Sequence, residues 1–405
     1  MKRNRLSFLA AISALGLSIF APVAPAKDAE QVQTAPVVEA GEKTAAKIAP
    51  PAVKQPVIQL AILLDTSNSM DGLIDQAKTQ LWKIVNEFIA VKRDGVRPLL
   101  QVALFEYGND GLSAKENHIR LVLPLTDDLD KVSKELFALK TNGGQEYCGA
   151  VIKAALDRLD WSKDNADLKV VYIAGNEPFN QGPIDFRISC KDSITKGIQI
   201  NTIFCGNNNE GITTFWKDGA VLSDGSFVSI DSDAKVADVA APQDKTLAEL
   251  SGKLNDTFVP MANKKGLEGA ENQKAQDANS SGISPANAAQ RASVKGSAFY
   301  RNDWCLVDHV FTDKVKIEDV KAEDLPENMK KMSMTERKTY LEGKKKERDS
   351  IQKQIAELSI ERGKYVEAEL KKIAEKDGVE TLDTAVIKTA RKQAEAKNFK
   401  FEQQK

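Results

Sequence analysis

The chain carries a short run of hard-oxygen side chains in a position suited to metal chemistry. Asp65-Thr66-Ser67-Asn68-Ser69 directly follows residues 57–64, a nearly continuous apolar run of the kind that forms a strand buried on both faces. Two hydroxyls at alternate positions of a tight loop can face one point, and the Asp65 carboxylate supplies negative charge. Mg²⁺ prefers such oxygen ligands. The run predicts a site for Mg²⁺, or for Mn²⁺ or Ca²⁺, held by Asp65, Ser67 and Ser69. The alternative is that these residues only satisfy the loop backbone and cap the next helix.

The surrounding sequence alternates strands with helices. Apolar runs predict strands at 57–64, 99–105, 119–123, 168–174 and 200–204, and helical periodicity predicts helices at 73–91, 129–139, 147–159, 184–196 and 247–258. Such alternation builds a doubly wound, mostly parallel sheet of the α/β class, covered by helices on both faces. Ligands of these sheets bind at the carboxyl ends of the strands. The loops expected to meet there contain residues 65–69, 143–144, 175–177 and 205–206.

This arrangement resembles the von Willebrand factor A domain over roughly residues 57–258. The most specific part of the likeness is Asp65-Thr66-Ser67-Asn68-Ser69, which matches the DxSxS loop of the family's metal-ion-dependent adhesion site. The resemblance implies a domain, expected at 56–262, that binds a protein partner. It also implies that an acidic side chain of the partner completes the coordination of the ion.

Two other loops depart from the family's pattern. The family carries a Thr in its second loop, where the best match here is Gln145, and an Asp after a later strand, where Gly175 stands. Either the site has lost its ion, or Glu146, Asn176 and Glu177 supply replacement oxygens. A carboxylate one or two residues away still reaches an ion through a water, which favours replacement. The substituted loops also resemble a bacterial, exported subgroup of uncharacterised function, in residues 143–149, 174–179 and 201–206.

The N-terminus has the features of a signal peptide. Three of the first five residues are basic, an apolar run covers residues 6–20, and Ala24-Pro25-Ala26 fits the small-residue cleavage pattern. We therefore predict a signal peptide at 1–26, with an uncleaved anchor as the alternative. Residues 27–55 are expected to be a flexible linker. We therefore expect a periplasmic or secreted protein with no later membrane span.

The four cysteines lack both CxxC pairing and zinc-ligand spacing; they are Cys148, Cys190, Cys205 and Cys305. An oxidising compartment favours at least one disulfide. Right-handed connections put the helices that carry Cys148 and Cys190 on one face of the sheet, which favours a bond between these two residues. Cys205 is the main competitor for either partner, and buried free thiols are the alternative.

The last third of the chain is expected to be linker and helix. Residues 263–297, rich in Gly, Asn, Ser, Gln and Ala, predict a second low-order linker, and residues 298–405 a helical region. Apolar residues within 299–311 are expected to dock on the sheet domain. Ser333-Met334-Thr335-Glu336 is a capping-box pattern. From Ile351 onward, apolar residues recur about every 3.5 positions, which is typical of a helical hairpin or short coiled coil.

Composition and motifs exclude several classes of function. A net charge of −1 and an aromatic content of 6% give no reason to expect a nucleic-acid partner. His118 and His309 are the only histidines, and no P-loop, GxSxG or HExxH motif occurs, so we predict no enzymatic activity. The favoured function is an exported protein-interaction or adhesion module with a degenerate divalent-metal site. The alternative is a metal-independent scaffold protein of the envelope.

Overall fold

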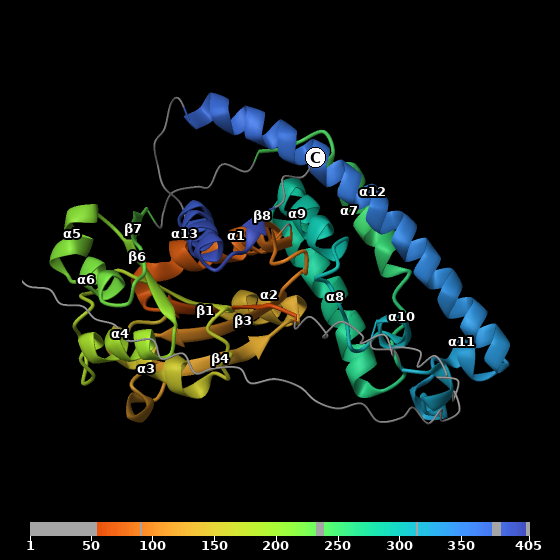
Figure 1. Ribbon diagram of the computed structural model, residues 1–405, viewed down its shortest axis with the longest axis horizontal. Coiled ribbons are helices and arrows are strands. Elements are labelled where there is room, and N and C mark those ends of the chain that lie inside the picture. Colours follow the sequence, from red (N-terminus) through yellow and green to blue (C-terminus); the bar gives the residue numbers. More distant parts are fainter. Residues whose placement is uncertain (1–54, 90, 232–238, 313–314, 375–381, 402–405) are drawn as a thin grey trace, which may run out of the picture. The chain divides into compact units, whose positions relative to one another are not determined.

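The computed structural model of the protein describes residues 55–89, 91–231, 239–312, 315–374 and 382–401 (Figure 1). The expected signal peptide lies outside these residues, as does all of the expected linker except Gln55. None of the helices within the described ranges is long and apolar enough to cross a membrane.

A six-stranded sheet carries the candidate site. Its strands lie in the order β4-β3-β1-β5-β6-β7, and all neighbours are parallel except β3 and β4. The prediction of a mostly parallel α/β sheet is confirmed. The strands are β1 (Val57–Asp65), β3 (Leu99–Tyr107), β4 (Ile119–Thr126), β5 (Leu168–Gly175), β6 (Gln199–Cys205) and β7 (Phe227–Ile230).

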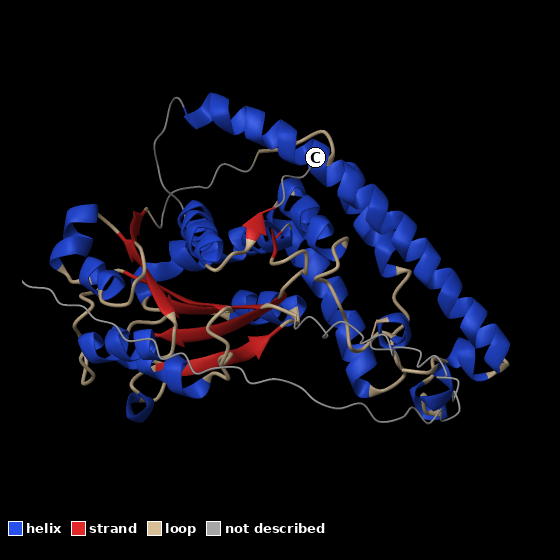
Figure 2. Ribbon diagram, in the orientation of Figure 1, coloured by secondary structure: helices blue, strands red, loops and turns tan. Residues whose placement is uncertain are grey.

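Helices cover both faces of this sheet (Figure 2). One hydrophobic core joins the sheet to α1, α2, α7 and α13, and a second core joins the opposite face to α3, α4 and α6. The helices are α1 (Asp71–Ile89), α2 (Leu129–Ala138), α3 (Cys148–Arg158), α4 (Phe186–Thr195), α6 (Trp216–Val221), α7 (Asp244–Asn255) and α13 (Leu382–Ala396). The sequence analysis missed β7, α5 (Asn208–Thr213) and α6, because elements this short show no clear periodicity.

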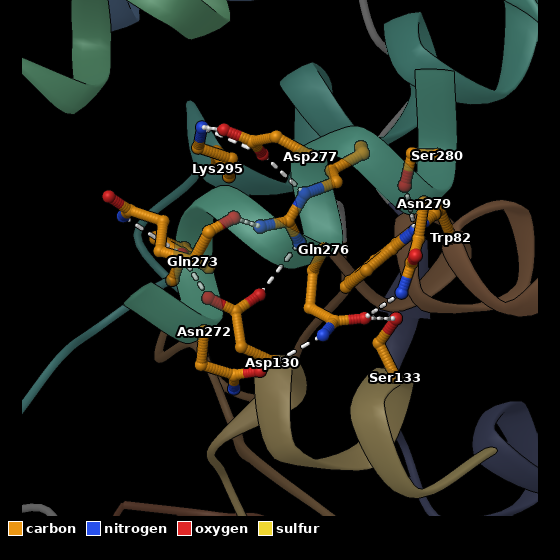
Figure 3. A network of polar contacts seen from close by, with 12 residues as sticks. Trp82, Asp130, Ser133, Asn272, Gln273, Gln276, Asp277, Asn279, Ser280 and Lys295 are labelled. Atoms are coloured by element: carbon orange, nitrogen blue, oxygen red, sulfur yellow. Dashed lines mark hydrogen bonds and ion pairs between the residues drawn. The ribbon is translucent and has the colours of Figure 1, made fainter. Parts of the chain in front are cut away.

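Residues 263–297 are not the low-order linker that their composition predicts. They form α8 (Lys264–Ile283) and α9 (Pro285–Lys295). The helix α8 packs on α9 and α2, and a polar contact joins it to α1, since Trp82 Nε1 donates to Ser280 Oγ over 2.9 Å. Figure 3 shows further polar pairs of this kind between α8 and α2. The polar residues that indicated disorder are therefore buried hydrogen-bonding partners, which a count of apolar residues does not detect.

A buried network of charges fixes α8 and α9 to α2 (Figure 3). The Arg291 guanidinium lies 2.7 Å from Asp130 Oδ1 and 2.5 Å from Asp277 Oδ1, and Lys295 Nζ lies 2.8 Å from Asp277 Oδ2. The Tyr300 hydroxyl donates to the second oxygen of Asp130 over 2.5 Å. Arg291 and Lys295 are 1% and 0% exposed. Burial lowers the pKa of Lys295 to about 8, although Asp277 acts to raise it. Such charges remain buried only when their partners are in place.

The remaining elements are β2 (Val91–Lys92), β8 (Lys400–Phe401), α10 (Leu306–Phe311), α11 (Glu327–Lys330), α12 (Met334–Ala374) and short 3₁₀ helices at Ala114–Glu116, Ile317–Asp319 and Ala322–Asp324. Residues 299–311 dock on the sheet domain as expected, with the Trp304 ring 5.7 Å from that of Phe258. The capping box is present, because the Ser333 N–H donates to Glu336 Oε2 over 2.7 Å.

The long helix α12 packs on α7, α9 and α10. Arg348, on its buried side, donates to the Thr257 carbonyl over 2.8 Å and pairs with Asp308 over 2.8 Å. The spacing that suggested a coiled coil therefore marks a face that docks on the sheet domain. The C-terminal region is helical, as predicted, except for β8, which pairs with β2 in antiparallel fashion.

Replacing Arg291 by Met should destabilise the protein by about 3 kcal/mol or more, because Asp130 would then be buried without a cation and Asp277 would keep only Lys295. Urea unfolding measures the loss. Lys353→Met, at an exposed position on α12, is the matched control and should change stability by less than about 0.5 kcal/mol. Equal effects of the two variants would contradict a structural role for the network.

Candidate functional site

Four parallel strands end at one edge of the sheet. β1 ends at Asp65, β3 at Tyr107, β5 at Gly175 and β6 at Cys205. β1 lies between β3 and β5, where the chain passes from one side of the sheet to the other. In α/β sheets ligands bind outside the carboxyl ends of the strands at such a point. The sequence prediction thus placed the DxSxS loop at the position of the fold best suited to a ligand.

The loop after β1 brings together a carboxylate and two hydroxyls. The Ser67 N–H donates to Asp65 Oδ1 over 2.8 Å, and Ser67 Oγ lies 3.2 Å from Ser69 Oγ. The 3₁₀ turn Asn68–Met70 leads into α1, and the Ser67 side chain makes no capping bond to it. Instead, Ser69 Oγ accepts from Asn176 Nδ2 over 3.1 Å. Asp65 therefore satisfies loop backbone, whereas the Ser69 hydroxyl contacts the loop after β5 and the Ser67 hydroxyl contacts Ser69 rather than capping the helix.

The second carboxylate oxygen of Asp65, Oδ2, is buried without a hydrogen bond of ordinary geometry. Burial raises the pKa of Asp65 to about 7, and the charge of Glu177 adds to the rise. The Ser67 N–H and O–H and the Asn176 N–H act to lower it. An unpaired oxygen in the interior is costly. It therefore marks a position that a proton or a cation would stabilise.

Gly175 stands against Asp65, where the family pattern has an Asp. A Cβ atom on Gly175 would lie 2.5 Å from the Tyr107 hydroxyl and 2.9 Å from Asp65 Oδ2. The Tyr107 hydroxyl fills this space and donates to the Ala174 carbonyl over 3.0 Å. The structure leaves no room for a second aspartate at this position, because Tyr107 and Asp65 itself occupy the space.

Glu146, and not Gln145, turns toward Asp65. Gln145 is exposed, and its Oε1 accepts from the Tyr147 hydroxyl over 2.8 Å. Glu146 is 7% exposed. Gly108 has a φ of +76°, which favours glycine, and a Cβ atom there would lie 2.8 Å from Asp65 Oδ1 and 2.9 Å from Glu146 Cγ. The two acidic side chains therefore meet above Gly108.

Asn176 and Glu177 approach from the loop after β5. Asn176 contacts Ser69 directly, as described above, whereas the Glu177 carboxylate accepts from Gln181 Nε2 over 3.3 Å. The Glu177 carbonyl accepts from Trp216 Nε1 over 2.8 Å, which fixes this loop to α6. Asn176 thus reaches the DxSxS loop, and Glu177 contributes negative charge from the rim.

Burial and neighbouring carboxylates together set the electrostatics of the site. Burial raises the pKa of Glu146 to about 7, and the charges of Asp65, Glu177 and Asp110 raise it further. The charges that act most strongly on Asp65 and Glu146 are all negative, and like charges disfavour ionisation. Within the described ranges, no three Asp, Glu, His or Cys side chains have the arrangement of a metal centre. The oxygen donors gathered here are hydroxyls and an amide as well as carboxylates.

The predicted disulfide is absent: all four cysteines are buried, and none of them is joined to another. The helices α3 and α4 do pack together, as right-handed connections require, and both Cys148 and Cys190 lie in the core between them and the sheet. The Cys148 thiol faces the Tyr107 hydroxyl over 3.8 Å instead of a second sulfur. Cys205 packs into the core on the opposite face of the sheet. Burial raises the pKa of the Cys190 thiol to about 12.

Sequence reasoning missed three residues that shape the site, namely Tyr107, Gly108 and Trp216. None of them belongs to a metal-binding motif, so a search for such motifs does not select them. Tyr107 and Gly108 nevertheless follow the strand predicted at 99–105, and the rule that ligands bind at strand ends would have singled them out. Trp216 had no such signal, because α6 itself was not predicted.

Residues 59–214 match the family model of the von Willebrand factor type A domain. This segment contains all of the candidate oxygen donors, from Asp65 to Glu177, and its mostly parallel sheet flanked by helices is a von Willebrand factor A fold. The match ends before β7, so the helices from α7 onward lie outside it. None of the curated proteins matches this chain.

Solved structures resemble the chain at low sequence identity. BatB from Bacteroides thetaiotaomicron is 16% identical, and the likeness covers 43% of this chain and 90% of BatB with a TM-score of 0.33. The VWA domain of SpRpn10 is 15% identical, with 45% of this chain and 100% of that domain covered and a TM-score of 0.33. Proximal thread matrix protein 1 from the mussel byssus is 13% identical, with 44% of this chain covered and a TM-score of 0.32. The likeness covers only 42% of the mussel protein.

The stability of the metal-free protein should fall as the pH rises from 5 to 7.5. Burial raises the pKa of Asp65 from 3.8 to about 7, so the folded state holds a proton that the unfolded chain has lost. That advantage disappears as the pH passes the folded-state pKa. One such group predicts a loss of roughly 2 kcal/mol, measured by urea unfolding in EDTA.

Asp65→Asn should reduce this pH dependence, because the amide does not titrate. Asp218→Asn, at an exposed position on α6, is the control and should leave the profile unchanged. A wild-type stability that stays level or rises over the same pH range would contradict the protonation of Asp65 in the fold.

Gly175→Ala should destabilise the protein by about 1–3 kcal/mol, because the methyl group would meet the Tyr107 hydroxyl. Tyr107→Phe removes that hydroxyl, so the double variant should recover part of the loss in a double-mutant cycle of urea unfolding. Gly252→Ala, in α7 with no atom near the added carbon, is the control. A cost of Gly175→Ala that is the same with and without the hydroxyl would show that Tyr107 does not exclude side chains here.

Proposed function

We propose that this protein is an exported interaction module whose carboxyl-edge loops bind a partner protein through a divalent metal ion. The observation that carries the proposal is Asp65 Oδ2, which is buried without a hydrogen bond. The strongest charges around it are other carboxylates. A cation would therefore offset both the missing hydrogen bond and the accumulated negative charge, and hard oxygen donors suit Mg²⁺, Mn²⁺ or Ca²⁺.

The donor set supports this proposal. The side chains that would hold the ion are Asp65, Ser67, Ser69, Glu146 and Asn176, with Glu177 at the rim. The Ser67 N–H fixes one oxygen of Asp65 and leaves the other free, and Asn176 orients the Ser69 hydroxyl. Such supporting contacts set the direction in which ligand oxygens point. A bound ion would supply positive charge at this edge of the sheet.

The partner is proposed to be a protein, because the matched family is one of protein-binding domains. The family resemblance implies that an acidic side chain of the partner meets the ion. Export to the periplasm or the medium is proposed from the signal-peptide pattern at 1–26, and the interaction domain is proposed to occupy residues 56–262. The docked helices α8, α9 and α12 would then add a second surface.

A metal-independent scaffold of the envelope is the second candidate. One observation favours it: the pKa values of Asp65 and Glu146 are both raised to about 7. A proton on either carboxyl group would then offset the buried negative charge without an ion. In this case the helical surface, and not the carboxyl edge, would make the contacts with other proteins.

Mg²⁺, Mn²⁺ or Ca²⁺ at millimolar concentration should raise the melting temperature of protein that has been stripped of metal. An ion that binds only the folded state stabilises it, by about 2.7 kcal/mol at a concentration of 100 times Kd. The rise should be larger at pH 8 than at pH 6, because protons compete with the ion for Asp65 and Glu146. Thermal unfolding followed by circular dichroism measures both effects.

Asp65→Ala should fold but lose the metal-dependent rise, whereas Asp218→Ala on the exposed side of α6 should keep it. The same rise in Asp65→Ala as in the wild type would place the ion elsewhere on the protein. No rise for any of the three ions in the wild type would favour the scaffold function instead.

A further inference from the structure

Glu146 lies beside the Asp65 carboxylate at the carboxyl edge of the sheet. It is 7% exposed. Its Cγ lies 2.9 Å, and Asp65 Oδ1 2.8 Å, from the point where a Gly108 Cβ would stand. Gly144 makes this approach possible, since a Cβ atom there would lie 2.1 Å from the Gly108 carbonyl oxygen. The glycines allow the two loops to come close enough for Glu146 to reach Asp65.

Three acidic side chains act on one another at this edge of the sheet, rather than one or two. Asp65, Glu146 and Glu177 act on one another, and a divalent ion that displaced the protons of Asp65 and Glu146 would face three carboxylates, whose total charge exceeds its own. Like charges repel more strongly at a partly buried site than in water. A fourth carboxylate, brought by a partner, would therefore meet a site that is already negative.

A second observation, independent of the number of acids, points to a ligand at this place. Asp65 Oδ2 is a buried oxygen that makes no hydrogen bond, although Asp65 Oδ1, Ser67 and Ser69 all have partners. The site therefore has one buried oxygen, Asp65 Oδ2, that lacks a hydrogen-bond partner, and this oxygen faces Gly175. Glu146 lies on the other side of the same carboxylate, beside Oδ1 at Gly108, so an ion held by Asp65 would lie near both groups.

We propose that Glu146 is a built-in carboxylate ligand that completes the metal site and makes the wild-type protein reject acidic partners. This inference rests on the proposed metal site. It replaces the acidic partner side chain that the family resemblance implies with a carboxylate from the chain itself. The partner surface that meets the loaded site then carries neutral or basic groups, because these suit its remaining negative charge.

Manganese and acetate test this proposal with the full chain. Acetate stands for the carboxylate of an acidic partner, and the water-proton relaxation of bound Mn²⁺ reports whether acetate displaces a coordinated water. In the wild type, acetate at about 50 mM should leave the relaxation unchanged when compared with NaCl of equal ionic strength. Glu146→Gln should bind Mn²⁺ about tenfold more weakly or worse. At saturating Mn²⁺, its relaxation enhancement should fall when acetate is added.

Glu210→Gln, at an exposed position on α5, is the matched control and should behave like the wild type. An acetate effect of the same size in the wild type and in Glu146→Gln would overturn the inference while leaving the metal site intact. Unchanged Mn²⁺ affinity in Glu146→Gln would do the same. Absence of Mn²⁺ binding by the wild type would overturn both this inference and the proposed function. If Glu146→Gln does not fold, the wild-type titration decides alone, because displacement of water by acetate there contradicts a built-in carboxylate.

Discussion

The two oxygens of the Asp65 carboxylate have different environments, and much of the carboxyl edge is built around that difference. Oδ1 accepts the Ser67 N–H, whereas Oδ2 is buried without a partner. Glycines at 108 and 175 stand where any side chain would collide with one oxygen or the other. A carboxylate so enclosed is stable only when a proton or a cation joins it. The loops after β1, β3 and β5 therefore share one electrostatic constraint.

The helices that follow the matched segment are part of the same fold and not a separate appendage. Arg291 and Lys295 join α9 to α2 and α8 through buried ion pairs. On the sheet itself, the Asn201 and Gln393 side-chain amides exchange two hydrogen bonds of 2.9 Å, which fix α13 to β6. Buried polar pairs of this kind are costly when one partner is missing. The sheet that carries the carboxyl-edge loops is thus covered in part by α13, which comes from the far end of the chain.

Local patterns in the sequence predicted the sheet and the first loop of the site well. The apolar run before Asp65 and the alternation of strands and helices are properties of short segments, and they suffice to define a parallel sheet and its carboxyl edge. The choice between Gln145 and Glu146 as the inward residue was less accessible, because it depends on the close approach of Gly144 to the Gly108 carbonyl, across two loops. The predicted disulfide was wrong for a related reason, since neighbouring helices do not guarantee that their thiols face each other.

The helices at residues 264–295 were predicted to be a low-order linker, and the reason for this error is different. Their interior is held by Gln, Ser, Arg and Lys side chains, so composition indicated disorder where the fold has buried hydrogen bonds. Several of these residues are satisfied by partners far away in the chain, as Ser280 is by Trp82 on α1 and Arg291 by Asp130 on α2. Partners separated by more than a hundred residues leave no periodic signal in a single sequence. The same limitation hid the role of α13.

Anomalous diffraction from crystals grown with Mn²⁺ would locate the proposed ion directly. We expect a single strong anomalous peak within coordination distance of the Asp65 carboxylate, with the Ser67 or Ser69 hydroxyl and Glu146 beside it. Absence of a peak at the carboxyl edge, or a peak elsewhere with Asp65 Oδ2 still unpartnered, would contradict the metal site and leave a protonated carboxyl pair as the explanation of this pocket.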